Sequence, residues 1–239
     1  MSDNGPSTAV SSTAAPGGSS KLFDALLIGL PDAVTSLWCL WVWMHPLTLG
    51  PEAVKCVVLM MLMEFILLNA TGFFTAIPFL LDLGRGIRIG MILGLCLVYL
   101  ALIAAFAAQF HAVWPYFTFG WMVAGKLVWI VRNRRVCDAE QMWLMGTWAV
   151  SVVAYLGAVG IGATQAMPRL GITPEIVPLL HLPGGGEWID TPEKAVASAV
   201  MYFAAVALFK WLYVAVRKNQ PERAPAVADG EAESFGPAV

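Results

Sequence analysis

Six long apolar runs are the feature of this sequence that most constrains its fold. A helix needs about 20 apolar residues to cross the hydrocarbon core of a bilayer. Backbone groups inside a bilayer find no water to bond, so runs of this length form helices that satisfy their own hydrogen bonds. The predicted spans are about 22–44, 53–80, 89–110, 113–131, 141–164 and 194–216. The sequence therefore predicts an all-α fold, a polytopic integral membrane bundle of six transmembrane helices.

The placement of charge supports this fold and orients it. Only 13% of the residues are charged, against about 25% in soluble domains. Lysine and arginine fall mainly in the loops on one side of the predicted bundle, which positive residues mark as cytoplasmic. That side holds Lys21, Arg85, Arg88, Arg132, Arg134, Arg135, Arg217, Lys218 and Arg223, and the other holds Lys55, Arg169 and Lys194. We therefore expect both termini in the cytoplasm. Abundant Ala, Gly and Pro, with Arg in the inner loops, indicates a bacterial inner membrane.

The remaining segments divide the chain around one membrane domain, residues 21–218. Residues 1–20 and 219–239 are rich in small and polar residues that cannot bury enough apolar area to offset the entropy of ordering. We expect both to be disordered cytoplasmic tails. The loop 165–193 is long for a connection without structure, and such loops often serve as lids or binding elements. We expect a structured outer loop here, with Glu187, Trp188 and Asp190 as candidate functional residues.

Prolines set the expected helix boundaries. Gly50-Pro51-Glu52 and Thr191-Pro192-Glu193 each combine a cap, a proline at the first helical position and an early carboxylate, and should start the second and sixth spans. Thr173-Pro174-Glu175 has the same form and predicts a short helix over about 174–181. Pro31 interrupts the first run, which leaves an alternative in which 21–30 is a separate interfacial helix. We favour one continuous span.

Five polar residues are predicted to lie at membrane depth. They are Asp32, Glu64, Asn69, Lys126 and Lys210. A charge at the centre of a bilayer costs about 2.5–3.5 kcal/mol on insertion scales. The two lysines have stems long enough to reach the inner headgroups, and Asp32 could pair with either of them. Glu64 is too short to reach water from mid-membrane, so it must be protonated, paired or open to a polar cavity.

Two groups of small residues have a structural and a functional interpretation. Gly86, Gly90 and Gly94 are four residues apart and form a stripe that lets a second helix approach closely. The partner is either a helix of this chain or a second copy of it. Cys39 and Cys56 fall near the outer ends of adjacent spans, where a disulfide is conceivable, although separate apolar thiols are the simpler interpretation.

The three histidines, His45, His111 and His181, all fall on the outer side in this topology. Histidine is a common metal ligand and proton carrier. Three converging imidazoles would bind a metal such as copper or zinc, but their spacing matches no metal motif, and isolated interfacial histidines are ordinary.

Three classes of function follow. Charges at depth favour a small transporter, permease-like or channel-like protein. The glycine stripe and the small size allow an accessory or assembly subunit of a larger membrane complex, or a homo-oligomer. The outer histidines allow a metal-binding redox enzyme, although no catalytic motif supports an enzyme. The sequence indicates no particular cofactor, the bilayer as the principal partner and no nucleic acid.

Overall fold

The computed structural model describes residues 18–80, 85–131, 138–164 and 167–219, and the side chains of 27–74, 86–87, 89–125, 145–164 and 167–216. Every regular element in these ranges is helical. The long helices are α1 (Gly18–Met44), α2 (Pro51–Leu80), α3 (Arg85–Gln109), α4 (Trp114–Val131), α5 (Asp138–Gly162) and α7 (Pro192–Asn219). The 3-10 helix η1 (Val177–Leu180) and the one-turn α6 (Glu187–Asp190) lie between α5 and α7. The predicted all-α fold is thus confirmed for the described residues, whereas the two predicted tails fall almost wholly outside them.

The proline signals locate two helix starts correctly and fail at the third. α2 begins at Pro51 and α7 at Pro192, each with a glutamate in its first turn. The helix predicted over 174–181 is wrong, because 174–176 form turns and only Val177–Leu180 is helical. Pro178 has no N–H to donate, and His181 has a φ of 47°, which ends the helix.

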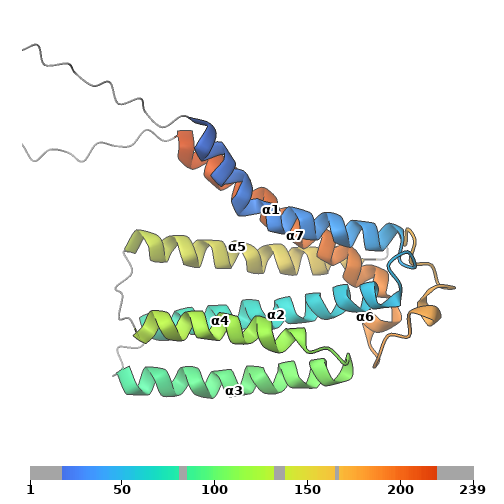
Figure 1. Cartoon of the computed structure of the whole chain (residues 1–239), viewed down its shortest axis with the longest axis horizontal. Coiled ribbons are helices and arrows are strands. Elements are labelled where there is room, and N and C mark those ends of the chain that lie inside the picture. The colour runs from blue at the N-terminus through green and yellow to red at the C-terminus, as the bar shows by residue number, and fades with distance from the viewer. Residues whose placement is uncertain (1–17, 81–84, 132–137, 165–166, 220–239) are drawn as a thin grey trace, which may run out of the picture.

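α1 runs without a break through Pro31, so the alternative of a separate helix over 21–30 is wrong. A proline in a helix interior removes one backbone hydrogen bond and bends the helix. Figure 1 shows α1 bent partway along its length, with its N-terminal part and the C-terminal part of α7 turning away from the other helices side by side. Tight packing helps to hold the two helices together: Ser36 Oγ donates a hydrogen bond to the Val200 carbonyl at 2.9 Å.

The long helices alternate in direction: short links join α1 to α5 in sequence, and the long loop with η1 and α6 joins α5 to α7. The starts of α1, α3 and α5 and the ends of α2, α4 and α7 lie at one end of the bundle (Figure 1). The opposite end carries η1, α6 and the connecting loops, and we call it the loop end. α7 packs against α1, α5 and α2, while α3 packs against α2 and α4.

Two hydrophobic cores share α2. The first joins α1, α2, α5 and α7 and includes Val42, Val58 and Tyr155. The second joins α2, α3 and α4 and includes Ile92 and Phe119. α2 is therefore the central helix, and a polar residue on it lies near both cores.

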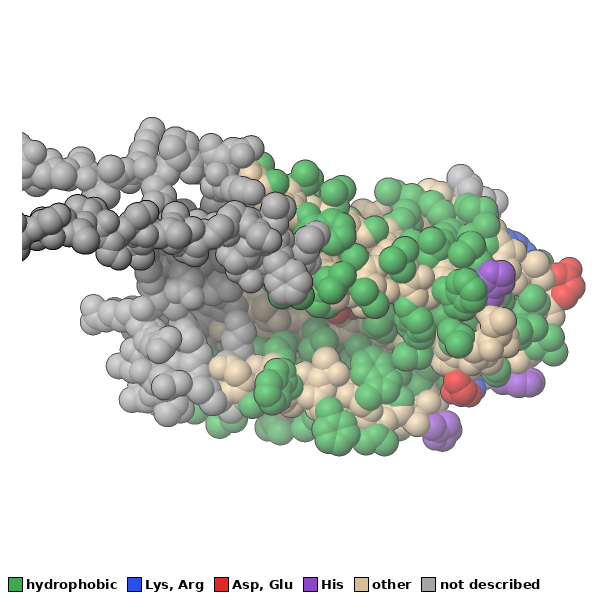
Figure 2. Space-filling model, turned by 45° about the horizontal axis from the view of Figure 1, so that its top comes forward, with side chains coloured by type: hydrophobic (Ala, Val, Ile, Leu, Met, Phe, Trp, Pro, Cys, Tyr) green, Lys and Arg blue, Asp and Glu red, His purple; other side chains and the backbone are tan. Residues whose placement is uncertain are grey.

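The surface between the two ends of the bundle is largely apolar. Phe117, Val153 and Leu97 are 74%, 71% and 68% exposed although each lies within a long helix. In Figure 2, hydrophobic side chains run along the molecule, whereas charged and histidine side chains gather at one end. Soluble monomers rarely expose so much contiguous apolar surface, and lipid is the solvent that covers it.

Five of the long helices are long and apolar enough to cross a membrane. Their apolar windows are Leu27–Met44, Pro51–Phe74, Ile89–Gln109, Met145–Gly162 and Pro192–Val216. α4 is the shortest of the long helices, with 18 residues that include Lys126, and it does not meet the same criterion. The chain is a multi-pass, membrane-embedded helical protein.

The described part of the outer loop is ordered on the bundle rather than extended from it. Gly171 N–H donates to the Trp43 carbonyl at 3.1 Å, and a side chain at Gly171 would collide with the Met44 carbonyl. Ile172 and Leu180 are fully buried in the first core. The loop is therefore attached at its start to the end of α1 and near its middle to the core.

Candidate functional site

Glu64 is held by a tyrosine from the opposite side of the first core. Tyr202 Oη donates a hydrogen bond of 2.5 Å to Glu64 Oε1. The two residues come at similar depths, roughly 20 Å into α2 and roughly 15 Å into α7 from the loop end at 1.5 Å per residue. Among the described residues, Tyr202 is the hydrogen-bond partner of Glu64 Oε1, and Glu64 Oε2 has no hydrogen-bond partner.

A second tyrosine fixes the first. Tyr155 Oη on α5 donates to the Met61 carbonyl of α2 at 3.0 Å. Its ring meets that of Tyr202 edge to face, with 5.5 Å between centroids. A buried phenol needs a partner for its hydroxyl, and these two contacts set the ring positions. α2, α5 and α7 are thereby connected around Glu64.

Asp32 and Lys210 form an ion pair between α1 and α7. Lys210 Nζ lies 2.6 Å from Asp32 Oδ2, and their side chains are 27% and 17% exposed. Of the two lysines that Asp32 could reach, the structure pairs it with Lys210, which therefore does not extend to the headgroups alone.

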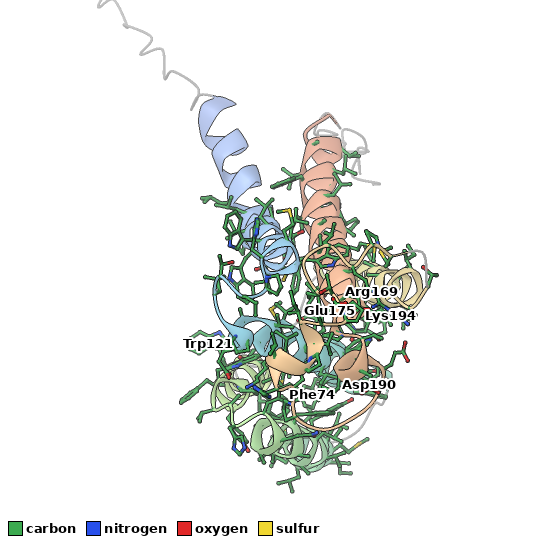
Figure 3. All side chains as sticks on the ribbon, turned by 90° about the vertical axis from the view of Figure 1, so that its right-hand side faces the viewer. Phe74, Trp121, Arg169, Glu175, Asp190 and Lys194 are labelled. Atoms are coloured by element: carbon green, nitrogen blue, oxygen red, sulfur yellow. The ribbon has the colours of Figure 1, made fainter. Side chains whose placement is uncertain are left out.

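A cavity of about 490 Å³ reaches Glu64 from the side of the bundle. Its lining comes from three helices: Glu64, Leu67, Leu68 and Thr71 of α2, Thr118, Trp121 and Met122 of α4, and Thr147, Trp148 and Ser151 of α5. All of these residues lie within helices and none in a connecting loop. The cavity therefore opens between helices at membrane depth, and Figure 3 places Trp121 at the edge of the bundle.

The wall of this cavity on α5 depends on a glycine of α2. Trp148 Nε1 donates to the Leu68 carbonyl at 2.9 Å. A Cβ at Gly72 would lie 2.6 Å from the Trp148 ring, so only glycine lets the indole come this close to α2. Beside it, Thr147 Oγ1 is buried and has no hydrogen-bond partner among the described residues.

Asn69, another predicted group at depth, does not join this site. Asn69 Nδ2 donates to the Phe65 carbonyl one turn earlier in α2, at 2.8 Å, so its amide is used within its own helix. The side chain of Lys126 lies outside the described residues.

The three histidines are not brought together. His45, His111 and His181 are all exposed at the loop end, and Figure 2 shows histidine side chains as separate patches there. His45 stacks on Trp41, with 4.7 Å between ring centroids. No group of three His, Cys, Asp or Glu side chains with metal-binding geometry occurs among the described residues. The hypothesis of converging imidazoles is wrong, because His45, His111 and His181 follow three different helices, α1, α3 and η1, and do not meet at one point.

The outer-loop candidates lie near a second, smaller cavity. It measures about 390 Å³, and its lining includes Glu187 and Trp188 but not Asp190. Glu187 makes an ion pair with Lys194, whose hydrogen bond and charge hold the pKa of the Glu187 carboxyl below its ordinary value. Nearby, Arg169 Nε lies 3.5 Å from Glu193 Oε1. Figure 3 shows Arg169, Lys194 and Asp190 together at the loop end. These pairs join the loop to the start of α7.

The structure leaves the glycine stripe open and the two cysteines unpaired. A Cβ at Gly86, Gly90 or Gly94 would meet nothing within 4 Å, so the stripe packs on no described part of this chain. A helix-packing face toward another chain stays a prediction. Cys39 and Cys56 are free thiols, which agrees with the simpler interpretation of separate apolar thiols.

Sequence reasoning missed Tyr155, Tyr202 and every lining residue of the cavity except Glu64, including Trp121, Thr147 and Trp148. A signal for the tyrosines was present, because a hydroxyl or phenol in mid-span must find an acceptor. The depth of Tyr202 in its run also matches that of Glu64. No signal in the sequence indicates that α4 and α5 flank α2.

Comparisons of this chain with protein-family models, with curated proteins and with solved structures found no match.

Proposed function

We propose that this chain is a small multi-pass transport protein that moves protons through Glu64. The single observation that carries the proposal is the cavity that reaches this carboxyl from the side of the bundle. A carboxylate at membrane depth is costly and usually marks a path for ions or protons. Tyr202 occupies one of its oxygens and leaves the other to exchange a proton with molecules in the cavity.

The proposal includes six spans, with both termini in the cytoplasm of a bacterial inner membrane. Support comes from the lysines and arginines of the predicted inner loops, and from the start of α1 and the end of α7 at one end of the bundle (Figure 1). α4 counts as the sixth span because it runs antiparallel to α3 and packs on the second core. A fluorescent reporter fused after residue 239 is expected to fluoresce in the cytoplasm. Alkaline phosphatase active at the same position would overturn this topology.

Proton flux into vesicles tests the transport function. The purified chain is placed in liposomes that contain pyranine and potassium, and valinomycin then makes the interior negative. We expect faster acidification than in protein-free vesicles, and a loss of most of this flux in Glu64→Gln. Glu52→Gln is the matched control, because Glu52 lies on the same helix but is exposed. Flux equal to that of empty vesicles rejects proton movement, and full flux in Glu64→Gln rejects the role of Glu64.

The second candidate function is a subunit of a larger membrane assembly or homo-oligomer. The open stripe of Gly86, Gly90 and Gly94 favours it, since such stripes allow close approach of a second helix. Gly90→Ile is expected to reduce the cross-linked oligomer in native membranes. Gly160→Ile is the control, because Gly160 of α5 is equally open. Cross-linking that neither change affects rejects this face as the contact.

A further inference from the structure

The cavity beside Glu64 is much larger than a proton path requires. Its volume is about 490 Å³, whereas a water molecule takes about 30 Å³ of liquid. Pockets for small organic molecules fall in the range of about 300–1,000 Å³. The volume therefore matches an organic ligand.

The charge of the cavity wall determines which charge the ligand can carry. Glu64 is the only ionisable side chain among the described residues that line the cavity. The Asp32–Lys210 pair beside it is closed on itself at 2.6 Å, so its charges largely offset each other. An ionised carboxylate accepts hydrogen bonds and attracts cations but repels anions. The ligand that fits this wall is a cation.

The rest of the wall suits a cation with an apolar body. Trp121 and Trp148 present indole rings, the side chains that attract cations most strongly. Leu67, Leu68 and Met122 add apolar surface. Thr118 and Ser151 add polar side chains to the lining.

The position of the opening agrees with such a ligand. Trp121 is 85% exposed and lies at the edge of the bundle (Figure 3). Thr118, one turn earlier in α4, is also exposed. A molecule reaching the cavity passes these side chains from the lipid. Amphipathic organic cations partition into bilayers and approach from that direction.

We infer that the cavity lined by α2, α4 and α5 binds an amphipathic organic cation, with Glu64 as the counter-charge and Trp121 and Trp148 around the apolar body. This inference rests on the proposed function for its claim that the cation is carried through the membrane. The binding step is separate and is tested without a membrane gradient.

Equilibrium binding of tetraphenylphosphonium to the full chain in detergent tests the inference. Tetraphenylborate, which has nearly the same shape and the opposite charge, is the matched probe, and protein-free micelles measure partitioning. We expect saturable binding of the phosphonium and none of the borate. Glu64→Gln should weaken phosphonium binding by about tenfold or more, because the counter-charge is lost while the acceptor for Tyr202 is kept. Glu52→Gln should bind as the wild type does.

A second variant separates loss of charge from loss of fold. Ser151→Leu adds bulk to the α5 wall without changing any charge, and should also weaken binding while the protein elutes as a single peak. The inference is overturned if the wild type shows no saturable phosphonium binding, if the borate binds equally, or if neither variant weakens binding. Normal phosphonium binding without proton flux in vesicles rejects the transport function alone. Proton flux without phosphonium binding rejects the ligand class alone.

Discussion

Replacing Asp32 with Asn tests whether the ion pair between α1 and α7 stabilises this bundle. The change keeps the size of the side chain but leaves Lys210 without its counter-charge. The two side chains are only 17% and 27% exposed, and Nζ and Oδ2 are 2.6 Å apart. Removing one partner of a fully buried pair costs about 3–5 kcal/mol, whereas an exposed pair contributes about 0.2–1 kcal/mol. Because the pair is partly exposed, we expect Asp32→Asn to lower the free energy of unfolding by about 2–3 kcal/mol. This is roughly a 30- to 150-fold change in the unfolding equilibrium.

A second ion pair with the same N–O distance serves as the control. Lys55 Nζ and Glu52 Oε1 are also 2.6 Å apart, but the Glu52 side chain is 76% exposed. Glu52→Gln should therefore cost less than about 1 kcal/mol. The double variant Asp32→Asn with Lys210→Met removes both charges, and should recover most of the loss of the single change, because no unpaired charge remains.

Reversible unfolding in mixed micelles with sodium dodecyl sulfate, followed by circular dichroism, measures these free energies. The reasoning fails if Asp32→Asn loses no more stability than Glu52→Gln. It also fails if the double variant is as unstable as the single one, since the cost would then come from packing and not from an unpaired charge.

Three further predictions concern close contacts and pH. Gly72→Ala should lower the free energy of unfolding by about 1–3 kcal/mol, because the new methyl overlaps the Trp148 indole of α5. Gly86→Ala, at an open position, should not lower it. Equal losses in the two variants would reject the packing argument. Gly171→Ala should break the hydrogen bond from Gly171 N–H to the Trp43 carbonyl, because the new methyl would collide with the Met44 carbonyl. The loop should then be cleaved faster by protease, and unchanged cleavage would contradict this. The pair of Glu187 with Lys194 lowers the pKa of the carboxyl from 4.5, so its stabilising contribution is present above that pH and is lost as the pH falls through the lowered folded value. The difference in unfolding free energy between wild type and Glu187→Gln should therefore shrink over that range, and a difference independent of pH would exclude the carboxylate as its source.

The sequence by itself determined where the helices lie. Long apolar runs must satisfy their backbone internally, and prolines mark the first turns at Pro51 and Pro192, so local chemistry located the long helices. The 3-10 turn at Val177–Leu180 was misread as a longer helix, because the missing N–H of Pro178 outweighed the start signal before it. These are local effects, and a sequence expresses them directly.

Only the tertiary structure decided which polar groups meet. Asp32 could have paired with either lysine, and the packing of α1 along α7 selects Lys210. Tyr202 lies far from Glu64 in the sequence and reaches it only because α7 crosses α2. The three histidines share the loop end of the bundle yet stay apart, since depth along a helix gives no information about position around the bundle. Helix periodicity and hydropathy fix depth, whereas neighbours in the plane of the membrane depend on side-chain packing between helices.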